Sequence, residues 1–562
     1  NLTISSDKVN ITNQITIKAG TNEKNLDSGA TNDANLTIKT KELKLAGDLN
    51  ISGFNKAEIT AKDGGNLTIG EASNNDNAKK VTFNKVKDSK ISAGDHNVTL
   101  NSKVETSNGD SGVENGSNDN NAGLTVTAKN VTVNNNITSQ NVTVAAKENL
   151  VTAENAVINA TSGTVNISTK TGDIKGGIES TSGNVNITAS GNTLKVSNIT
   201  GQDVTVTADA GALTTTAGST ISATTGNANI TTKTGDINGK VESSSGSVTL
   251  VATGATLAVG NISGNTVTIT ADSGKLTSTV GSTINGTNSV TTSSQSGDIE
   301  GTISGNTVNV TASTGDLTIG NSAKVEAKNG AATLTAESGK LTTQTGSSIT
   351  SSNGQTTLTA KDSSIAGNIN AANVTLNTTG TLTTTGDSKI NATSGTLTIN
   401  AKDAKLDGAA SGDRTVVNAT NASGSGNVTA KTSSSVNITG DLNTINGLNI
   451  ISENGRNTVR LRGKEIDVKY IQPGVASVEE VIEAKRVLEK VKDLSDEERE
   501  TLAKLGVSAV RFVEPNNAIT VNTQNEFTTR PSSQVTISEG KACFSSGNGA
   551  AVCTNVADDG QQ

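Results

Sequence analysis

The feature that most constrains the fold of this chain is an internal repeat. Gly163–Ile174 closely matches Gly226–Ile237, at an offset of about 63 residues. Thr207–Leu213 matches Thr270–Leu276 at the same offset, and a third copy begins at Thr335 after a slightly longer step. Self-similarity at a fixed period predicts a repeat architecture, in which each unit packs mainly on its neighbours.

A shorter period lies inside the long one. Its motif is apolar, Thr or Asn, apolar, Thr, Ala, followed by small residues that usually include Gly. The motif begins near Val185, Val204, Ala228, Val248, Val267, Val290, Val308, Ala332, Thr356, Val374 and Leu397. These ten steps average about 21 residues, so the long repeat equals three short ones. A βαβ unit needs about 30 residues and does not fit this step.

A step of this length fits one coil of a β-helix, with three short strands and three tight turns. Period-2 alternation directs the odd positions of Val185–Ala189 inward and the even positions outward. Gly, Ser, Asn and Asp supply corners, and Pro, which cannot donate to a strand ladder, first occurs at Pro473. We predict an all-β fold, a right-handed parallel β-helix rod over residues 1–445. Leucine-rich repeats of similar period need a Leu and Asn consensus that is missing.

The composition is compatible with this fold and poor for a globular one. Hydrophobic residues are 32% of the chain and aromatic residues only 1%. A globular core made from so few large apolar side chains would be weak, and the same composition could indicate disorder. Alternating Thr, Val and Ile argue against disorder, because they form strands. A thin solenoid needs only a narrow file of apolar side chains.

The charge pattern excludes several partners. The formal net charge is −8 and no Arg precedes Arg414, so we expect no binding of nucleic acid. No apolar run approaches the roughly 20 residues that span a bilayer. The sequence shows neither a signal peptide nor an initiating Met, and we expect a mature or truncated fragment of an exported protein.

The chain changes character near residue 445, where Arg, Pro and aromatic residues begin to appear. Capping boxes at Ser477–Glu480 and Ser495–Glu498 predict a helical hairpin over residues 477–506. Strand patterns resume after it, at Val507–Val513, Ala518–Val521 and Gln534–Ile537. We predict a small α/β cap over residues 446–540, because a solenoid end exposes a strand edge and an open core. The hairpin could instead dock a partner, and the two roles are compatible.

Two cysteines, Cys543 and Cys553, lie in the last segment, residues 541–562. The lack of Cys before this segment is typical of an exported protein, and the late pair predicts one local disulfide. The alternative is two free thiols in a C-terminal tail.

Candidates for catalytic chemistry are sparse. The single histidine, His96, is expected in a surface loop, without partners for a triad or a metal site. Asp173, Asp236 and Asp298 recur after Gly but lack the calcium-binding repeat, and we interpret them as turn caps. A polysaccharide lyase on this fold would need clustered Asp with Arg or Lys. We therefore predict no catalytic residue, no metal and no cofactor, and that the chain is not an enzyme.

Sequons are the one dense motif. Asn-x-Ser/Thr occurs 25 times between Asn1 and Asn437 and never afterwards. Chance alone would produce about 17, because roughly 56 Asn precede that point and about three residues in ten are Ser or Thr. Strand alternation also favours sequons, because it places Asn and Thr on the same outer face. Asn186 and Thr188, for example, should both face solvent. The candidate modification sites are Asn35, Asn66, Asn97, Asn130, Asn141, Asn166, Asn186, Asn198, Asn229, Asn261, Asn309, Asn373, Asn427 and Asn437.

The C-terminal segment carries a family resemblance. Lys541–Val556, the Val478–Leu505 hairpin and Val459–Val468 resemble the end of the high-molecular-weight adhesins, which are exoproteins of the two-partner secretion pathway of Gram-negative bacteria. The resemblance is close over residues 446–562. Over the repeats it is limited to the general pattern that any solenoid exoprotein would match.

The resemblance implies a location and partners. Such adhesins cross the outer membrane through a dedicated β-barrel translocator and stay tethered to it through a C-terminal disulfide loop, at the cell surface. They bind host epithelial glycans or glycoproteins, and a cytoplasmic N-glycosyltransferase adds hexoses to their sequons. The Asn-Pro-Asn motifs of their N-terminal secretion domain are missing, so we expect the C-terminal portion of a larger adhesin.

Two other functions are alternatives for a chain of this kind. One is a β-helical carbohydrate-active enzyme, a lyase or depolymerase, which would release new reducing ends. The other is ice binding by Thr-x-Thr ladders. The steps between motifs are uneven, and this argues against a regular array of Thr side chains.

Overall fold

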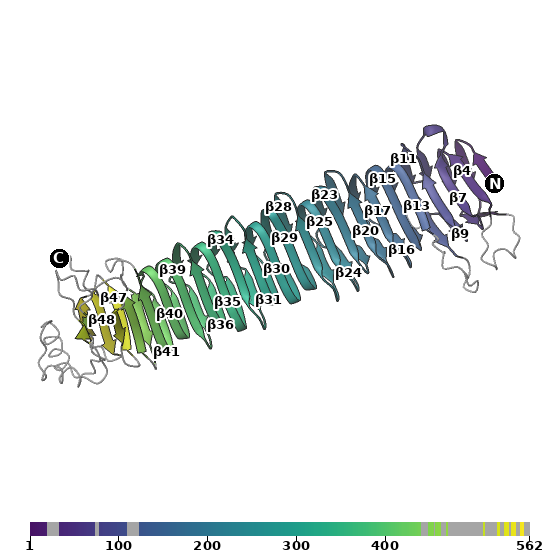
Figure 1. Cartoon of the computed structure of the whole chain (residues 1–562). Coiled ribbons are helices and arrows are strands. Elements are labelled where there is room, and N and C mark those ends of the chain that lie inside the picture. Colours follow the sequence, from purple (N-terminus) through teal and green to yellow (C-terminus); the bar gives the residue numbers. More distant parts are fainter. Residues whose placement is uncertain are drawn as a thin grey trace, which may run out of the picture. The chain divides into compact units, whose positions relative to one another are not determined.

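The computed structural model describes residues 1–19, 33–72, 78–108 and 123–439, and short stretches between 448 and 555. The chain divides into two units. Unit 1 comprises Asn1–Lys275 with Ile284–Gly286, and unit 2 comprises Leu276–Thr283 with Thr287–Gln562. The described residues are all-β and form parallel β-solenoid coils, about 18 turns with roughly 21 residues each (Figure 1). The predicted fold class is confirmed at this level.

Unit 1 is built from short strands that pair in parallel with the strands of the coils before and after. Its strands are β1 (Leu2–Ser5), β2 (Lys8–Ile11), β3 (Ile15–Lys18), β4 (Asn35–Thr40), β5 (Glu42–Leu45), β6 (Leu49–Ser52), β7 (Lys56–Ala61), β8 (Leu67–Ile69), β9 (Lys80–Asn84), β10 (Asp88–Ser92), β11 (Asn97–Leu100), β12 (Lys103–Ser107), β13 (Gly123–Val133), β14 (Ile137–Ser139), β15 (Asn141–Thr152), β16 (Ile158–Ala160), β17 (Val165–Thr169), β18 (Thr171–Ile174), β19 (Ile178–Ser180), β20 (Val185–Ala189), β21 (Thr193–Val196), β22 (Ile199–Gly201), β23 (Val204–Thr215), β24 (Thr220–Ala223), β25 (Ala228–Ile237), β26 (Lys240–Ser243), β27 (Val248–Ala252) and β28 (Thr256–Val259). The only helix among the described residues is the 3-10 turn η1 (Lys62–Gly64).

Two long strands, β29 (Ile262–Ser278) and β30 (Thr283–Ile299), contribute residues to both units. The further strands of unit 2 are β31 (Thr302–Ala312), β32 (Leu317–Ile319), β33 (Lys324–Ala327), β34 (Ala332–Thr343), β35 (Ser348–Ile365), β36 (Asn368–Thr378), β37 (Thr381–Thr384), β38 (Lys389–Ala392), β39 (Thr396–Leu406), β40 (Ala409–Ser423), β41 (Asn427–Ile438), β42 (Leu448–Ser452), β43 (Arg456–Leu461), β44 (Val468–Lys469), β45 (Val510–Arg511), β46 (Asn525–Thr528), β47 (Ser533–Ser538), β48 (Lys541–Ser546) and β49 (Ala551–Asn555).

The register within unit 1 confirms the short repeat. Val185, Val204, Ala228, Val248 and Val267 are consecutive partners in one column. The steps between them are unequal, yet any three consecutive steps add to the long repeat that the sequence shows. The strands keep their register because the extra residues fall at the corners.

Unit 2 repeats this arrangement by itself. Val308, Ala332, Thr356, Val374 and Leu397 are consecutive partners, in the order that the motif predicted. The steps between these partners are also unequal. Uneven steps are therefore compatible with regular columns of side chains, and they do not exclude regular columns of Thr.

The core is the file of inward positions. Val185 and Ile187 are fully buried on β20, whereas Asn186 and Thr188, which alternate with them along the strand, face outward, as predicted. Inward positions elsewhere are mostly Val, Ile, Leu and Ala at 0–2% exposure. Each coil adds a few apolar side chains between two similar layers, so a core forms without aromatic residues in most of the chain.

Inward hydroxyl groups stabilise the corners of the coils by hydrogen bonding to the backbone. The buried Thr215 hydroxyl accepts a hydrogen bond from the Gly239 backbone N–H at 2.9 Å, one coil later. Thr384 does the same for Gly408 at 3.1 Å. A Cβ at Gly239 would lie 2.6 Å from Ser219 Oγ, so the corner requires glycine. These groups satisfy N–H donors that the corner removes from the strand ladder.

The C-terminal strands change from parallel to antiparallel pairing. β42 and β43 still pair in parallel with β41, so the ladder extends past residue 445. β46 and β47 then pair antiparallel with β43 and β42. The predicted strand at residues 534–537 is confirmed as part of β47. The predicted helical hairpin, residues 477–506, lies outside the described residues.

Candidate functional surface

The three recurring aspartates do not cap turns. Asp173, Asp236 and Asp298 lie within strands β18, β25 and β30, on outward positions. The interpretation as turn caps was wrong, because the Gly before each Asp is an inward strand residue and not a corner. Asp173 forms a 3.9 Å ion pair with Lys175, which directly follows the strand. His96 is exposed in the turn between β10 and β11, as expected.

Metal-ligating groups do not gather in the part of the chain that the structure describes: no three His, Cys, Asp or Glu side chains meet there. Within the same residues, no helix is long and apolar enough to cross a membrane.

All fourteen candidate sequon asparagines point away from the core. The exposed ones are Asn66, Asn166, Asn198, Asn229, Asn261, Asn309, Asn373 and Asn427. The half-buried ones are Asn35, Asn97, Asn130, Asn141, Asn186 and Asn437. Alternation therefore places the amides correctly, although it does not test whether any carries a sugar.

Several of these amides have a structural role that the sequence did not reveal. Just before an inward-outward run of strand residues, the Asn oxygen accepts a backbone N–H from the next coil. Asn141 Oδ1 accepts from Thr164 at 2.8 Å, Asn198 from Thr220 at 2.9 Å, and Asn373 from Thr396 at 2.9 Å. Because Asn is useful at this position, part of the sequon density follows from packing between coils.

Asparagines also form ladders along the columns. In unit 2, Asn400 donates to Asn377 Oδ1 at 2.9 Å, Asn418 donates to Asn400 at 2.9 Å, and Asn437 donates to Asn418 at 2.7 Å. Four amides from four successive coils are thus joined head to tail. Sequence reasoning missed the ladder, because its members lie a whole coil apart and at unequal separations.

The ladder belongs to a surface without charge, which we call the Thr/Asn face. It consists of the outward residues of seven successive strands of unit 2: Asn309, Thr311, Thr333, Thr335, Thr357, Thr359, Thr375, Asn377, Thr398, Asn400, Val416, Asn418, Ser435 and Asn437. All fourteen are exposed or half-buried. Figure 1 shows their strands, β31 to β41, in the green part of the chain.

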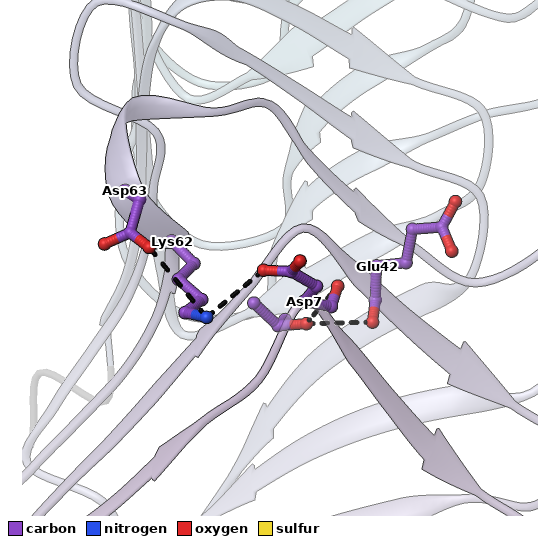
Figure 2. Close-up of polar contacts among 5 residues, drawn as sticks. Asp7, Glu42, Lys62 and Asp63 are labelled. Atoms are coloured by element: carbon purple, nitrogen blue, oxygen red, sulfur yellow. Dashed lines mark hydrogen bonds and ion pairs between the residues drawn. The ribbon is translucent and has the colours of Figure 1, made fainter.

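The first coils of unit 1 carry charge instead, as Figure 2 shows. Lys62 Nζ lies 3.2 Å from Asp7 Oδ1 and 3.8 Å from Asp63 Oδ2. Its hydrogen bond and positive charge, with a smaller effect from Lys41, hold the pKa of Asp7 below its ordinary value. Close to them, the buried Thr40 hydroxyl donates a bifurcated hydrogen bond to the carbonyl oxygens of Asp7 and Glu42.

The two cysteines face one another across a hairpin of unit 2. Strands β48 and β49 are antiparallel, and Cys543 is the register partner of Cys553. Directly opposed residues in such a pair have Cα atoms about 4.5–5.5 Å apart. A disulfide spans Cα separations of roughly 4.4–6.8 Å, so this register is compatible with the predicted bond.

Comparison with family models, with curated proteins and with solved structures found no match for this chain.

Proposed function

We propose that the chain is the stalk and anchor of a bacterial adhesin, tethered at the cell surface and binding host epithelial glycans or glycoproteins. The observation that carries this is the outward display of sequon amides over stacked parallel coils. Stacked parallel coils support a long array of modified positions, because each side chain is held at a fixed place on its coil. The C-terminal resemblance supplies the rest.

The finer architecture is part of the same proposal. We infer a right-handed coil, since parallel crossovers are almost always right-handed. A cap over residues 446–540 with a helical hairpin would protect the open end of the ladder, and the antiparallel strands β46 and β47 support this, because they change the pairing pattern there.

The anchor is assigned to residues 541–562. The opposed positions of Cys543 and Cys553 favour a disulfide that closes the loop between them. In the chain-entropy model such a loop contributes roughly 3 kcal/mol, which a long ladder does not need. A bond with little role in the fold suggests recognition, here by an outer-membrane β-barrel translocator after oxidation in the periplasm.

The decisive experiment changes Cys543 and Cys553 to Ser in cells that export the protein. We expect the adhesin to move from the cell surface into the medium while its circular dichroism stays β-rich. Full surface retention of the variant would contradict the anchor. Replacing Ser545 by Ala in the same loop is the matched control.

Two further measurements address the remaining assignments. Glycopeptide mapping of native protein should find hexose on several rod asparagines, such as Asn198 and Asn309, and none after residue 445. Unmodified peptides throughout would reject the modification. Incubation with a glycan panel should give binding without new reducing ends, and the appearance of reducing ends would favour the enzyme.

A further inference from the structure

The Thr/Asn face differs from the other two faces of unit 2 in charge. None of its fourteen residues is Lys, Arg, Asp or Glu. The neighbouring face carries Asp403 and Lys405 on outward positions of β39, and the third face carries Lys324 and Glu326 on β33. Charged residues are 17% of the chain, so an uncharged area over seven strands is a distinct surface.

Six of the fourteen side chains of this face take part in hydrogen bonds with one another or with the adjacent Gln355. The amides of Asn377, Asn400, Asn418 and Asn437 are joined by one hydrogen bond between each neighbouring pair in the ladder. Gln355 Nε2 lies beside them and donates to Thr357 Oγ1 at 3.2 Å and to Thr375 Oγ1 at 2.9 Å. Groups paired in this way lose less on removal from water than unpaired ones, so the face can be covered at modest cost.

The net charge limits what two copies of the chain can bring together. Each copy carries a formal charge of −8, and like charges repel when surfaces approach. The Thr/Asn face itself opposes no charged side chains when two copies of unit 2 meet through it. The exposed charged residues of the same strands lie at its margins, one outward position away: Glu337, Lys361, Lys402 and Arg414. Stacked, in-register strands with small uncharged side chains and Asn ladders are the kind of sheet that packs face to face.

The area of the face is sufficient. A strand segment of about five residues is roughly 16 Å wide, and seven coils at about 4.8 Å each extend roughly 34 Å. The product is about 550 Å² for each copy, or about 1,100 Å² in total, which exceeds the roughly 1,000 Å² expected of a specific interface.

We propose that the Thr/Asn face is a self-association surface, whose partner is the same face of a second copy of this chain. The pairing is isologous, so each residue of the face contacts the partner's copy of the face around a two-fold axis. Adhesin molecules on one cell, or on neighbouring cells, would be joined laterally by it.

The surface has a consequence for modification, and this part rests on the proposed function. Asn309, Asn377, Asn418 and Asn437 of the face are sequon asparagines. A hexose on any of them would stand between the two sheets. Sugar and self-association therefore compete for one face, and a modified chain should associate less than an unmodified one.

The test uses the full chain made without any glycosyltransferase, so its result does not depend on the adhesin assignment. Sedimentation over a concentration series should show a reversible dimer. The double variant Thr359→Lys and Thr398→Lys places like charges at the centre of the face, and we expect its dimer to be at least about 100-fold weaker.

The matched control, Thr342→Lys with Thr350→Lys, adds the same charge to the other two faces and should leave the dimer unchanged within about threefold. Circular dichroism checks that all three proteins fold. A wild-type chain that stays monomeric, or a dimer that both variants weaken equally, would overturn the proposal. A monomer whose glycan binding is lost only in the Thr359→Lys and Thr398→Lys variant would overturn it in favour of a neutral glycan as occupant.

Discussion

Two regions of unit 1 share one pattern of parallel backbone pairing but differ in the side chains that they present outward. In the coils at residues 33–108, one outward column contains Thr37, Glu58 and Lys90. In the coils at residues 123–275, the equivalent column contains uncharged residues such as Asn186 and Thr205. The parallel pairing is the same in both regions. Outward chemistry is therefore independent of the ladder, as long as inward positions remain apolar.

The two regions also differ in the number of residues per coil and in the size of the side chains that fill the core. The first has longer steps, such as the one from Thr60 to its register partner Ser92, and it buries Phe54 and Phe83. The second has shorter steps, such as the one from Asn166 to Asn186, and no aromatic residue. The two buried rings therefore lie in the region with the longer steps.

The largest effect is expected at the aromatic core of the first region. Phe83→Ala removes a fully buried ring and should lower the local free energy of unfolding by about 3–5 kcal/mol, since the cavity cannot close. Hydrogen exchange of β6, β9 and β12 would report it, because repeats unfold locally. Thr82→Ala, outward on the same strand, is the control and should change less than about 0.5 kcal/mol. Equal effects would mean that the ring does not support the coil.

A smaller effect is expected at a corner of the second region. Thr215→Val keeps the shape of the side chain but leaves the Gly239 N–H unpaired and buried, which should cost about 1–3 kcal/mol. Thermal unfolding and exchange at Gly239 would measure it. Thr214→Val, which changes the outward neighbour, should be nearly neutral. If the two variants behaved alike, the inward hydroxyl would not hold the corner.

The next effect concerns the amide bonds along the columns. Asn130 donates to Asn97 Oδ1 at 2.9 Å and accepts from the Asn149 N–H at 3.1 Å. Asn130→Ala in unmodified protein removes both bonds and should cost about 1–2 kcal/mol. Thr132→Ala on the same outer face is the control. A loss no greater than that of the control would show that such ladders follow from stacking and do not stabilise it.

The smallest effect is expected at the ion pairs of the first region. Lys62 lowers the pKa of Asp7, so the pair adds stability above the unfolded pKa and loses it as the pH falls through the lowered folded value. NMR titration should find the Asp7 pKa below its ordinary value, and Lys62→Gln should raise it toward that value. Because the pair is exposed, salt should weaken the shift. A pKa that neither Lys62→Gln nor salt moves would contradict the assignment.

Much of the fold could be predicted because its physics is local. Alternation at Val185–Ala189 fixes which side chains face inward, and the repeated motif identifies the residue that stacks on the next coil. The site was predicted less well. The outward positions of the sequons were correct, but the hydrogen bond of Asn141 to the next coil has no sequence signal. The strand positions of Asp173 and Asp236 were missed, because Gly was taken for a corner when it was an inward residue.

The sequence by itself determined the coil: its length, its inward file and its corners all follow from period-2 alternation and the residues that break it. Only the tertiary structure decided which outward side chains become neighbours. Members of a column such as Asn400 and Asn418 lie a whole coil apart, and the steps vary at the corners. Burial depends on each residue's own place in a strand, whereas the Thr/Asn face depends on the register between coils.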